Sequence, residues 1–256
     1  MRMSFSVERN PNRTGARASP ALTLCVVFAV FAAAIASSAA ADEAVGGGYL
    51  EKIRRHVTRT STVPDNGDLN PYAVVVAPVS AGKIQKGDVL VTNFNNVSNL
   101  QGTGGTIIDY NPSTKRTTVF ASLPQRLAEC PGGVGLGTAM TMLKSGWVIV
   151  GSTPSTDGTT RTKGDGCLLV LDADGKLAAA WTGPNINGPW GNMATIDKGS
   201  SATLFISMAG FDVPGPDVRD PATGYPVTIN KATVVRFQLS IAEGKPPVTA
   251  LRSPPC

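Results

Sequence analysis

The sequence predicts an all-β chain built from repeated four-stranded meanders, the kind of unit that forms one blade of a β-propeller. Short apolar runs alternate with turn-forming residues, and the 256 residues include 28 glycines and 19 prolines. Matching second strands begin at Val89, Trp147 and Leu204, at spacings of 58 and 57 residues. A near-constant spacing with weak identity indicates about three to four blades, an incomplete or small propeller. The alternative is a β-sandwich with irregular hairpins.

The unit from Gly132 to Trp181 shows this pattern most plainly. GGVGLGTAMTMLKSGWVIVGS supplies two strands, CLLVLDADGK a third, and LAAAWTG a fourth. Successive side chains of a strand point to opposite faces of the sheet. We therefore expect Val148 and Val150 on one face of this sheet, and Trp147 and Ile149 on the other.

The units on either side follow the same order of strands. The first unit is expected to contain strands at 72–78, 88–94, 105–110 and 116–121. The third is expected to contain strands at 191–196, 202–209 and 232–239, interrupted by a long proline-rich loop at 210–230. Residues 70–245 thus form the predicted propeller domain. A lead-in at 42–69 precedes it, for which a short helix and a strand are both open, and a proline-rich tail without a further blade follows at 246–256.

Residues 1–41 have the pattern of an export signal. Four arginines precede an apolar run of 16 residues, ALTLCVVFAVFAAAIA, and the small residues SSAAA follow it. A membrane-spanning helix needs about 20 apolar residues, so the run is short for a permanent anchor. We expect cleavage after Ala41, or else after Ala39 or Ala40, and a periplasmic or extracellular protein. The alternative is an uncleaved helix that anchors the chain in the inner membrane.

Charge and motif content identify no catalytic site. The formal net charge of +5 lies mostly in the leader, which argues against nucleic acid as a partner. The single histidine, His56, lies in the lead-in, and no cysteine–histidine spacing typical of zinc is present. The glycines of 132–137 are not followed by a helical pattern, so they do not indicate a dinucleotide-binding loop.

Asparagines near the predicted strand ends are candidates for a binding surface. In a propeller, the second-to-third-strand loops and the blade-to-blade loops lie on one face. The predicted residues of this loop face are Asn93, Asn95, Asn96, Asp157, Asn187, Trp190 and Asn192. Amide oxygens there could bind a hard cation such as Ca²⁺, although Asp88 and Asp157 are only loosely placed as carboxylate ligands. The alternative is that the asparagines cap turns by bonding their own backbone. The identity of any metal stays open.

Several runs resemble a known family. NPYAVVV, GDVLVTNFNNVSNLQGTGGTI, LKSGWVIVGSTPSTDG, GCLLVLDADGK and NGPWGNMA resemble NHL-repeat β-propellers, and more closely exported bacterial NHL-like proteins of unassigned role. The resemblance covers roughly residues 70–240. The resemblance implies a propeller fold but carries no activity over. We expect a binding or scaffold protein with an unknown protein or small-molecule ligand on its loop face. The alternatives are a divalent-cation-dependent hydrolase, as in the gluconolactonase-like lactonases, and an inactive truncated relative. Such propellers usually have more blades, so self-association is a further expectation.

Three cysteines remain after removal of the leader: Cys130, Cys167 and Cys256. Cys130 lies in the loop that enters the second unit, and Cys167 ends that unit's second-to-third-strand loop. Both loops reach the same face of a blade, so we expect a disulfide between these two cysteines. The alternative is a pair of buried free thiols. Cys256 would then be left unpaired and could link two chains.

Overall fold

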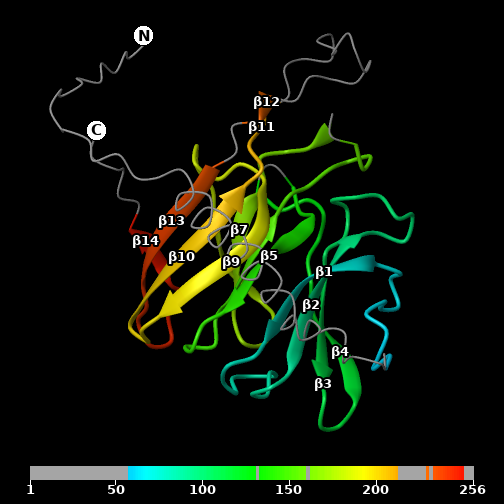
Figure 1. Cartoon of the computed structure of the whole chain (residues 1–256), viewed down its shortest axis with the longest axis vertical. Helices are drawn as coiled ribbons and strands as arrows, with labels where there is room; N and C mark the ends of the chain where they lie inside the picture. Colours follow the sequence, from blue (N-terminus) through cyan, green and yellow to red (C-terminus); the bar gives the residue numbers. More distant parts are fainter. Residues whose placement is uncertain (1–56, 131–132, 160–161, 213–228, 231–232, 251–256) are drawn as a thin grey trace, which may run out of the picture. The chain divides into compact units, whose positions relative to one another are not determined.

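The computed structural model describes residues 57–130, 133–159, 162–212, 229–230 and 233–250 (Figure 1). All the sheets described below belong to one compact unit, Thr58–Cys256. The predicted export signal with its helix, most of the lead-in, Gly132 and Cys256 lie outside the described residues. Within the described ranges, no helix is long and apolar enough to cross a membrane.

The first two sheets are four-stranded antiparallel meanders in chain order. The first consists of β1 (Leu69–Val76), β2 (Val89–Asn95), β3 (Thr106–Asn111) and β4 (Arg116–Ser122). The second consists of β5 (Leu136–Met142), β6 (Val148–Ser152), β7 (Cys167–Leu171) and β8 (Leu177–Trp181). Apolar runs separated by glycine-containing turns produce both sheets, which confirms the all-β prediction.

The third sheet has the same four-stranded order with one insertion. It consists of β9 (Pro189–Asp197), β10 (Ser201–Met208), β13 (Thr233–Ser240) and β14 (Val248–Ala250). The predicted long loop begins and ends in a two-stranded ladder of β11 (Phe211–Asp212) and β12 (Ile229–Asn230). Strand β14 was not predicted, because its residues directly follow Pro246 and Pro247. Proline is tolerated just before an edge strand, and Val248 pairs with Ser240 of β13.

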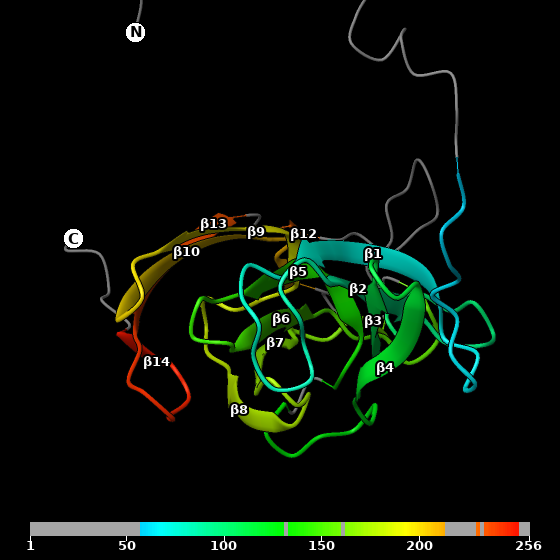
Figure 2. The ribbon, with the colours of Figure 1, turned by 90° about the horizontal axis from the view of Figure 1, so that it is seen from below.

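The first strands of the three sheets are neighbours. Strand β5 contacts β1 on one side and β9 on the other. The fourth strands, β4, β8 and β14, lie away from this group (Figure 2). One hydrophobic core therefore forms between the first and second sheets, and another between the second and third.

The second sheet is covered on both faces. Val148 and Val150 belong to the core shared with the first sheet, whereas Ile149 belongs to the core shared with the third, and Trp147 packs against that same core. The predicted alternation along this strand is confirmed. All five residues of β6 and all five of β7 are buried, which explains why both strands read as nearly continuous apolar runs.

Candidate functional site

At one end of all three sheets, the strands are joined by long connections. We call this end of the molecule the loop end. It comprises the described residues of the β2–β3 loop (96–105), the β4–β5 connection (123–135), the β6–β7 loop (153–166) and the β8–β9 connection (182–188). Three of the four connections contribute residues that the sequence predicted as a binding face.

Backbone hydrogen bonds join the loop end across the sheets. The Ser155 amide of the β6–β7 loop donates to the Gly102 carbonyl of the β2–β3 loop at 2.8 Å. On the other side, the Gly188 amide before β9 donates to the Asp165 carbonyl at 2.7 Å. The β6–β7 loop is thus held to both neighbours, so the position of its side chains depends on all three sheets.

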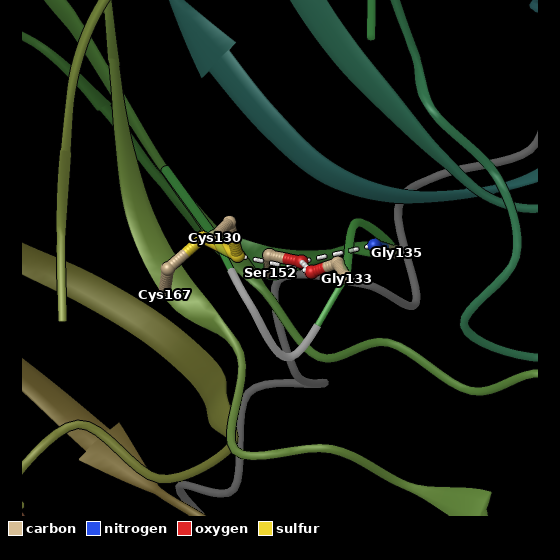
Figure 3. The surroundings of a disulfide bond; sticks show 5 residues. All are labelled: Cys130, Gly133, Gly135, Ser152 and Cys167. Carbon is tan, nitrogen blue, oxygen red and sulfur yellow. Dashed lines mark hydrogen bonds between the residues drawn. A yellow bond between two sulfur atoms is a disulfide. The ribbon is translucent and has the colours of Figure 1, made fainter. Parts of the chain in front are cut away.

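A disulfide joins Cys130 to Cys167, the pair that the sequence predicted. The two Cα atoms are 5.8 Å apart across a sequence separation of 37. Beside it, the Ser152 hydroxyl donates to the Gly133 carbonyl at 3.0 Å and accepts from the Gly135 amide at 2.9 Å (Figure 3). Together these bonds fix the β4–β5 connection to the ends of β6 and β7.

A hollow of about 640 Å³ lies between the β4–β5 connection and the β6–β7 loop. Its polar side chains are Gln125, Arg126, Ser155, Thr156 and Thr162, and Leu127, Val134 and Pro154 add apolar surface. Arg126 is exposed, and none of the described lining residues is acidic. Among the described lining residues, Arg126 therefore supplies the one positive charge, beside uncharged hydrogen-bonding groups.

Asp157 holds side chains on one wall of this hollow through hydrogen bonds. Its Oδ1 accepts hydrogen bonds from the Thr159 amide at 2.9 Å, from the Thr159 hydroxyl at 2.7 Å and from the Thr162 hydroxyl. The Ser155 and Thr162 hydroxyls lie 2.8 Å apart. Of the sequence-predicted residues, Asp157 is thus the one tied most directly to the hollow, through the hydroxyl groups that line it.

The asparagines near the end of β2 form hydrogen bonds with other residues of the first sheet's loops and of the segment before β1. Asn93 is buried, and its Nδ2 donates to the Thr62 carbonyl at 2.7 Å. Asn95 is also buried, and its Nδ2 donates to Asn99 Oδ1 at 2.6 Å. Asn96 Oδ1 accepts from the Ser98 amide at 3.0 Å, the turn-capping arrangement that the sequence left open as the alternative.

The remaining predicted residues lie at the start of the third sheet. The Asn187 carbonyl accepts from the Gly210 amide at 3.0 Å, and Asn192 is exposed on β9. Asp88, a loosely placed ligand candidate, precedes β2, while Asn95 ends that strand. Asn95 follows Asp88 by seven positions along an extended strand, so the two are roughly 20 Å apart. Among the described residues, no three His, Cys, Asp or Glu side chains gather as a metal site.

Trp190 belongs to an aromatic cluster that the sequence did not reveal. Its ring meets Phe94 of β2 edge to face, with centroids 5.0 Å apart, and Tyr72 of β1 at 5.9 Å. Tyr72 and Phe94 stack at 4.5 Å. The members of this cluster come from β1, β2 and β9. No local sequence pattern predicts the cluster, because its formation depends on how the first and third sheets meet.

Lys163 of the β6–β7 loop points into this cluster. Its Nζ lies 4.8 Å from the centroid of the Phe94 ring and 5.3 Å from that of Trp190. Nζ has less than 1 Å² of accessible surface and no hydrogen-bond partner among the described residues. Burial lowers the pKa of this amine from its ordinary value of 10.5 to about 8.

Gly102 leaves room for this ammonium group. A Cβ atom there would lie 2.8 Å from Lys163 Nζ and 2.7 Å from the Thr153 carbonyl oxygen. Its φ of 75° is also a left-handed conformation that suits glycine.

The described part of the loop end thus contains a hollow lined by the guanidinium group of Arg126 and, separately, the ammonium group of Lys163 held by aromatic rings. Both arrangements suit recognition of charged small molecules. No protein-family model matches this chain, and no curated protein matches it.

Proposed function

We propose that this chain is an exported, β-propeller-like binding protein that holds a small polar ligand with an anionic group at its loop end. Three successive four-stranded meanders whose first strands are neighbours support the comparison with propeller blades. The signal-like leader and the disulfide support export, because disulfides persist in oxidising compartments.

The observation that carries this proposal is the hollow beside Arg126. Its volume of about 640 Å³ suits a small molecule. A guanidinium group recognises a carboxylate or phosphate through paired hydrogen bonds. The hydroxyl groups of Ser155, Thr156 and Thr162 and the amide of Gln125 add neutral donors and acceptors. A ligand with one anionic group and several hydroxyl groups fits this lining best.

The walls of the hollow are held in place before any ligand arrives. The disulfide fixes the β4–β5 connection, and Gln125 Nε2 donates to the Thr103 carbonyl at 2.8 Å. Asp157 holds the Thr162 hydroxyl on the opposite wall. Binding to a preorganised site loses less affinity to the ordering of loops and side chains. This rigidity favours a role in binding.

Calorimetric titration with glucuronate, which carries one carboxylate and several hydroxyl groups, tests the proposal. The mature chain should bind it, and Arg126→Gln should weaken binding at least about tenfold, the loss of one charge-assisted contact. Arg116→Gln is the matched control, since it removes the same charge at the opposite end of β4. Failure of the unmodified chain to bind glucuronate, citrate or phosphate, or equal affinity in the two variants, would overturn the proposal.

A further inference from the structure

Aromatic rings surround the ammonium group of Lys163 in the way that they surround a bound cationic ligand. Its ammonium lies over the faces of two rings that meet at 85°, at 4.8 Å from one centroid and 5.3 Å from the other. Cations bind to aromatic faces within about 6 Å of the ring centroid, because the face of the ring carries negative potential. Phe94 and Trp190 therefore form two walls of an aromatic cage, and the Tyr72 ring stacks against that of Phe94.

The cage compensates the charge without hydrogen bonds. A buried ammonium group is normally paired with a carboxylate or with backbone carbonyls, since leaving water is otherwise costly. Nζ of Lys163 has no hydrogen-bond partner among the described residues. The remaining cost of burial is seen in the lowered pKa of the amine, about 8. A cation that cannot donate hydrogen bonds, such as a quaternary ammonium, would suit this environment better than lysine does.

We propose that Phe94, Trp190 and Tyr72 form a binding site for a methylated ammonium group, and that Lys163 is its internal occupant, which the ligand displaces. The occupant and the cage come from different elements: Lys163 from the β6–β7 loop, the rings from strands β1, β2 and β9. The lysine side chain can therefore leave by rotating about its own bonds, while the strands keep the rings in place.

Competition by Lys163 sets the expected affinity. A ligand that binds only when the cage is empty has its apparent affinity reduced by the fraction of molecules in that state. Removing the lysine side chain should consequently strengthen binding of a cation, the opposite of the usual effect of deleting a contact residue. This proposal does not depend on the anionic ligand proposed for the hollow beside Arg126, since it concerns other side chains and a ligand of opposite charge.

The test is titration of Lys163→Ala with tetramethylammonium chloride, followed by calorimetry and by tryptophan fluorescence. The variant should bind at least about tenfold more tightly than the unmodified chain, because the competing cation is gone. Lys86→Ala, which removes an exposed lysine at the other end of the sheets, should leave the affinity unchanged. Adding Trp190→Leu to Lys163→Ala should abolish binding. A folded Lys163→Ala that binds no better than the unmodified chain overturns the proposal.

A second measurement applies if Lys163→Ala does not fold. In the unmodified chain, saturating tetramethylammonium should expel Lys163 from the cage and expose its amine. Acetylation of Lys163 by acetic anhydride, followed by peptide mass spectrometry, should then increase severalfold, while acetylation of Lys86 stays constant. An unchanged rate at Lys163 across the titration would show that the lysine is a fixed structural cation and would overturn the proposal.

Discussion

Lys163 lies in a loop of the second sheet and Trp190 on the third sheet, yet the ammonium nitrogen of Lys163 is 5.3 Å from the centroid of the Trp190 ring. The contact joins the β6–β7 loop of the second sheet to the first strand of the third. Because Phe94 of the first sheet completes the arrangement, a single side chain meets all three sheets at the loop end. Changes at Lys163 therefore report on the assembly of the whole unit.

Lys163 should make stability depend on alkaline pH. Its folded-state pKa of about 8 lies below the ordinary value of 10.5, so the fold disfavours the protonated amine. The penalty is complete below pH 8 and is released as the pH rises toward 10.5. Urea unfolding at pH 8 and pH 10 should show the unmodified chain gaining free energy of unfolding relative to Lys163→Met. A constant difference between the two proteins would contradict this.

Asp109 should have the opposite dependence at acid pH. The residue is buried, with 7% of its surface exposed. Burial, and secondly the charge of Asp88, raise its pKa from 3.8 to about 6. The fold therefore favours the protonated carboxyl, and this contribution is lost as the pH rises from about 4 through 6.

We expect Asp109→Asn to raise the free energy of unfolding at pH 7 by roughly 1–2 kcal/mol and to have little effect at pH 4. Chemical denaturation at the two pH values measures it. Asp88→Ala serves as the comparison: Asp88 Oδ2 accepts from the Gln85 amide at 2.7 Å, and alanine leaves that amide without its acceptor, so this variant should not gain stability at pH 7 as Asp109→Asn does. Equal effects of Asp109→Asn at both pH values would argue against a raised pKa.

The disulfide should contribute strongly to stability. Replacing Cys130 and Cys167 together by serine should lower the free energy of unfolding by roughly 2–4 kcal/mol, because the unfolded chain is no longer cross-linked. Guanidinium unfolding of oxidised protein and of the double variant gives the difference. Cys256→Ser, the control, should leave the midpoint unchanged. An unaltered midpoint in the double variant would mean that the bond adds nothing to the fold.

Truncation in β6 should be costly on both faces of the second sheet. Val150→Ala opens space in the core with the first sheet, and Ile149→Ala opens it in the core with the third. We expect losses of roughly 1–3 and 2–5 kcal/mol. Val76→Ala, at a valine that is 62% exposed on the first sheet, should change stability by less than about 0.5 kcal/mol. Thermal unfolding of the three variants measures these losses. Similar losses for Val76→Ala and for the two core variants would contradict the prediction.

Local patterns predicted the strands, the alternation of Val148 and Ile149, and the disulfide. Strand alternation is a property of the backbone, and the disulfide followed from the turns that bring two loops to one end of a sheet. The short strand β14 escaped prediction because its pairing with β13 overrides the proline-rich sequence before it. The position of β14 at the edge of the third sheet follows from the strand order of that sheet, which its own sequence does not indicate.

The aromatic cage lay beyond the reach of the sequence for a different reason. Tyr72, Phe94, Lys163 and Trp190 are separated by long stretches of chain, and each reads separately as an ordinary strand or loop residue. Their meeting depends on the way three sheets associate, which no periodicity encodes. The prediction for the asparagines used only their positions near strand ends, which is why Asn96 emerges as a turn-capping residue.

The burial of β6 and β7 on both faces has a consequence for the newly made chain. The second sheet has no face suited to water, so it cannot persist alone, and the Ile149 face stays uncovered until β9, β10 and β13 have been synthesised. Until then the nascent protein exposes an apolar surface of the kind that leads to aggregation. A holding chaperone would have its natural target in this interval, and any premature stop after the second sheet would yield an insoluble product.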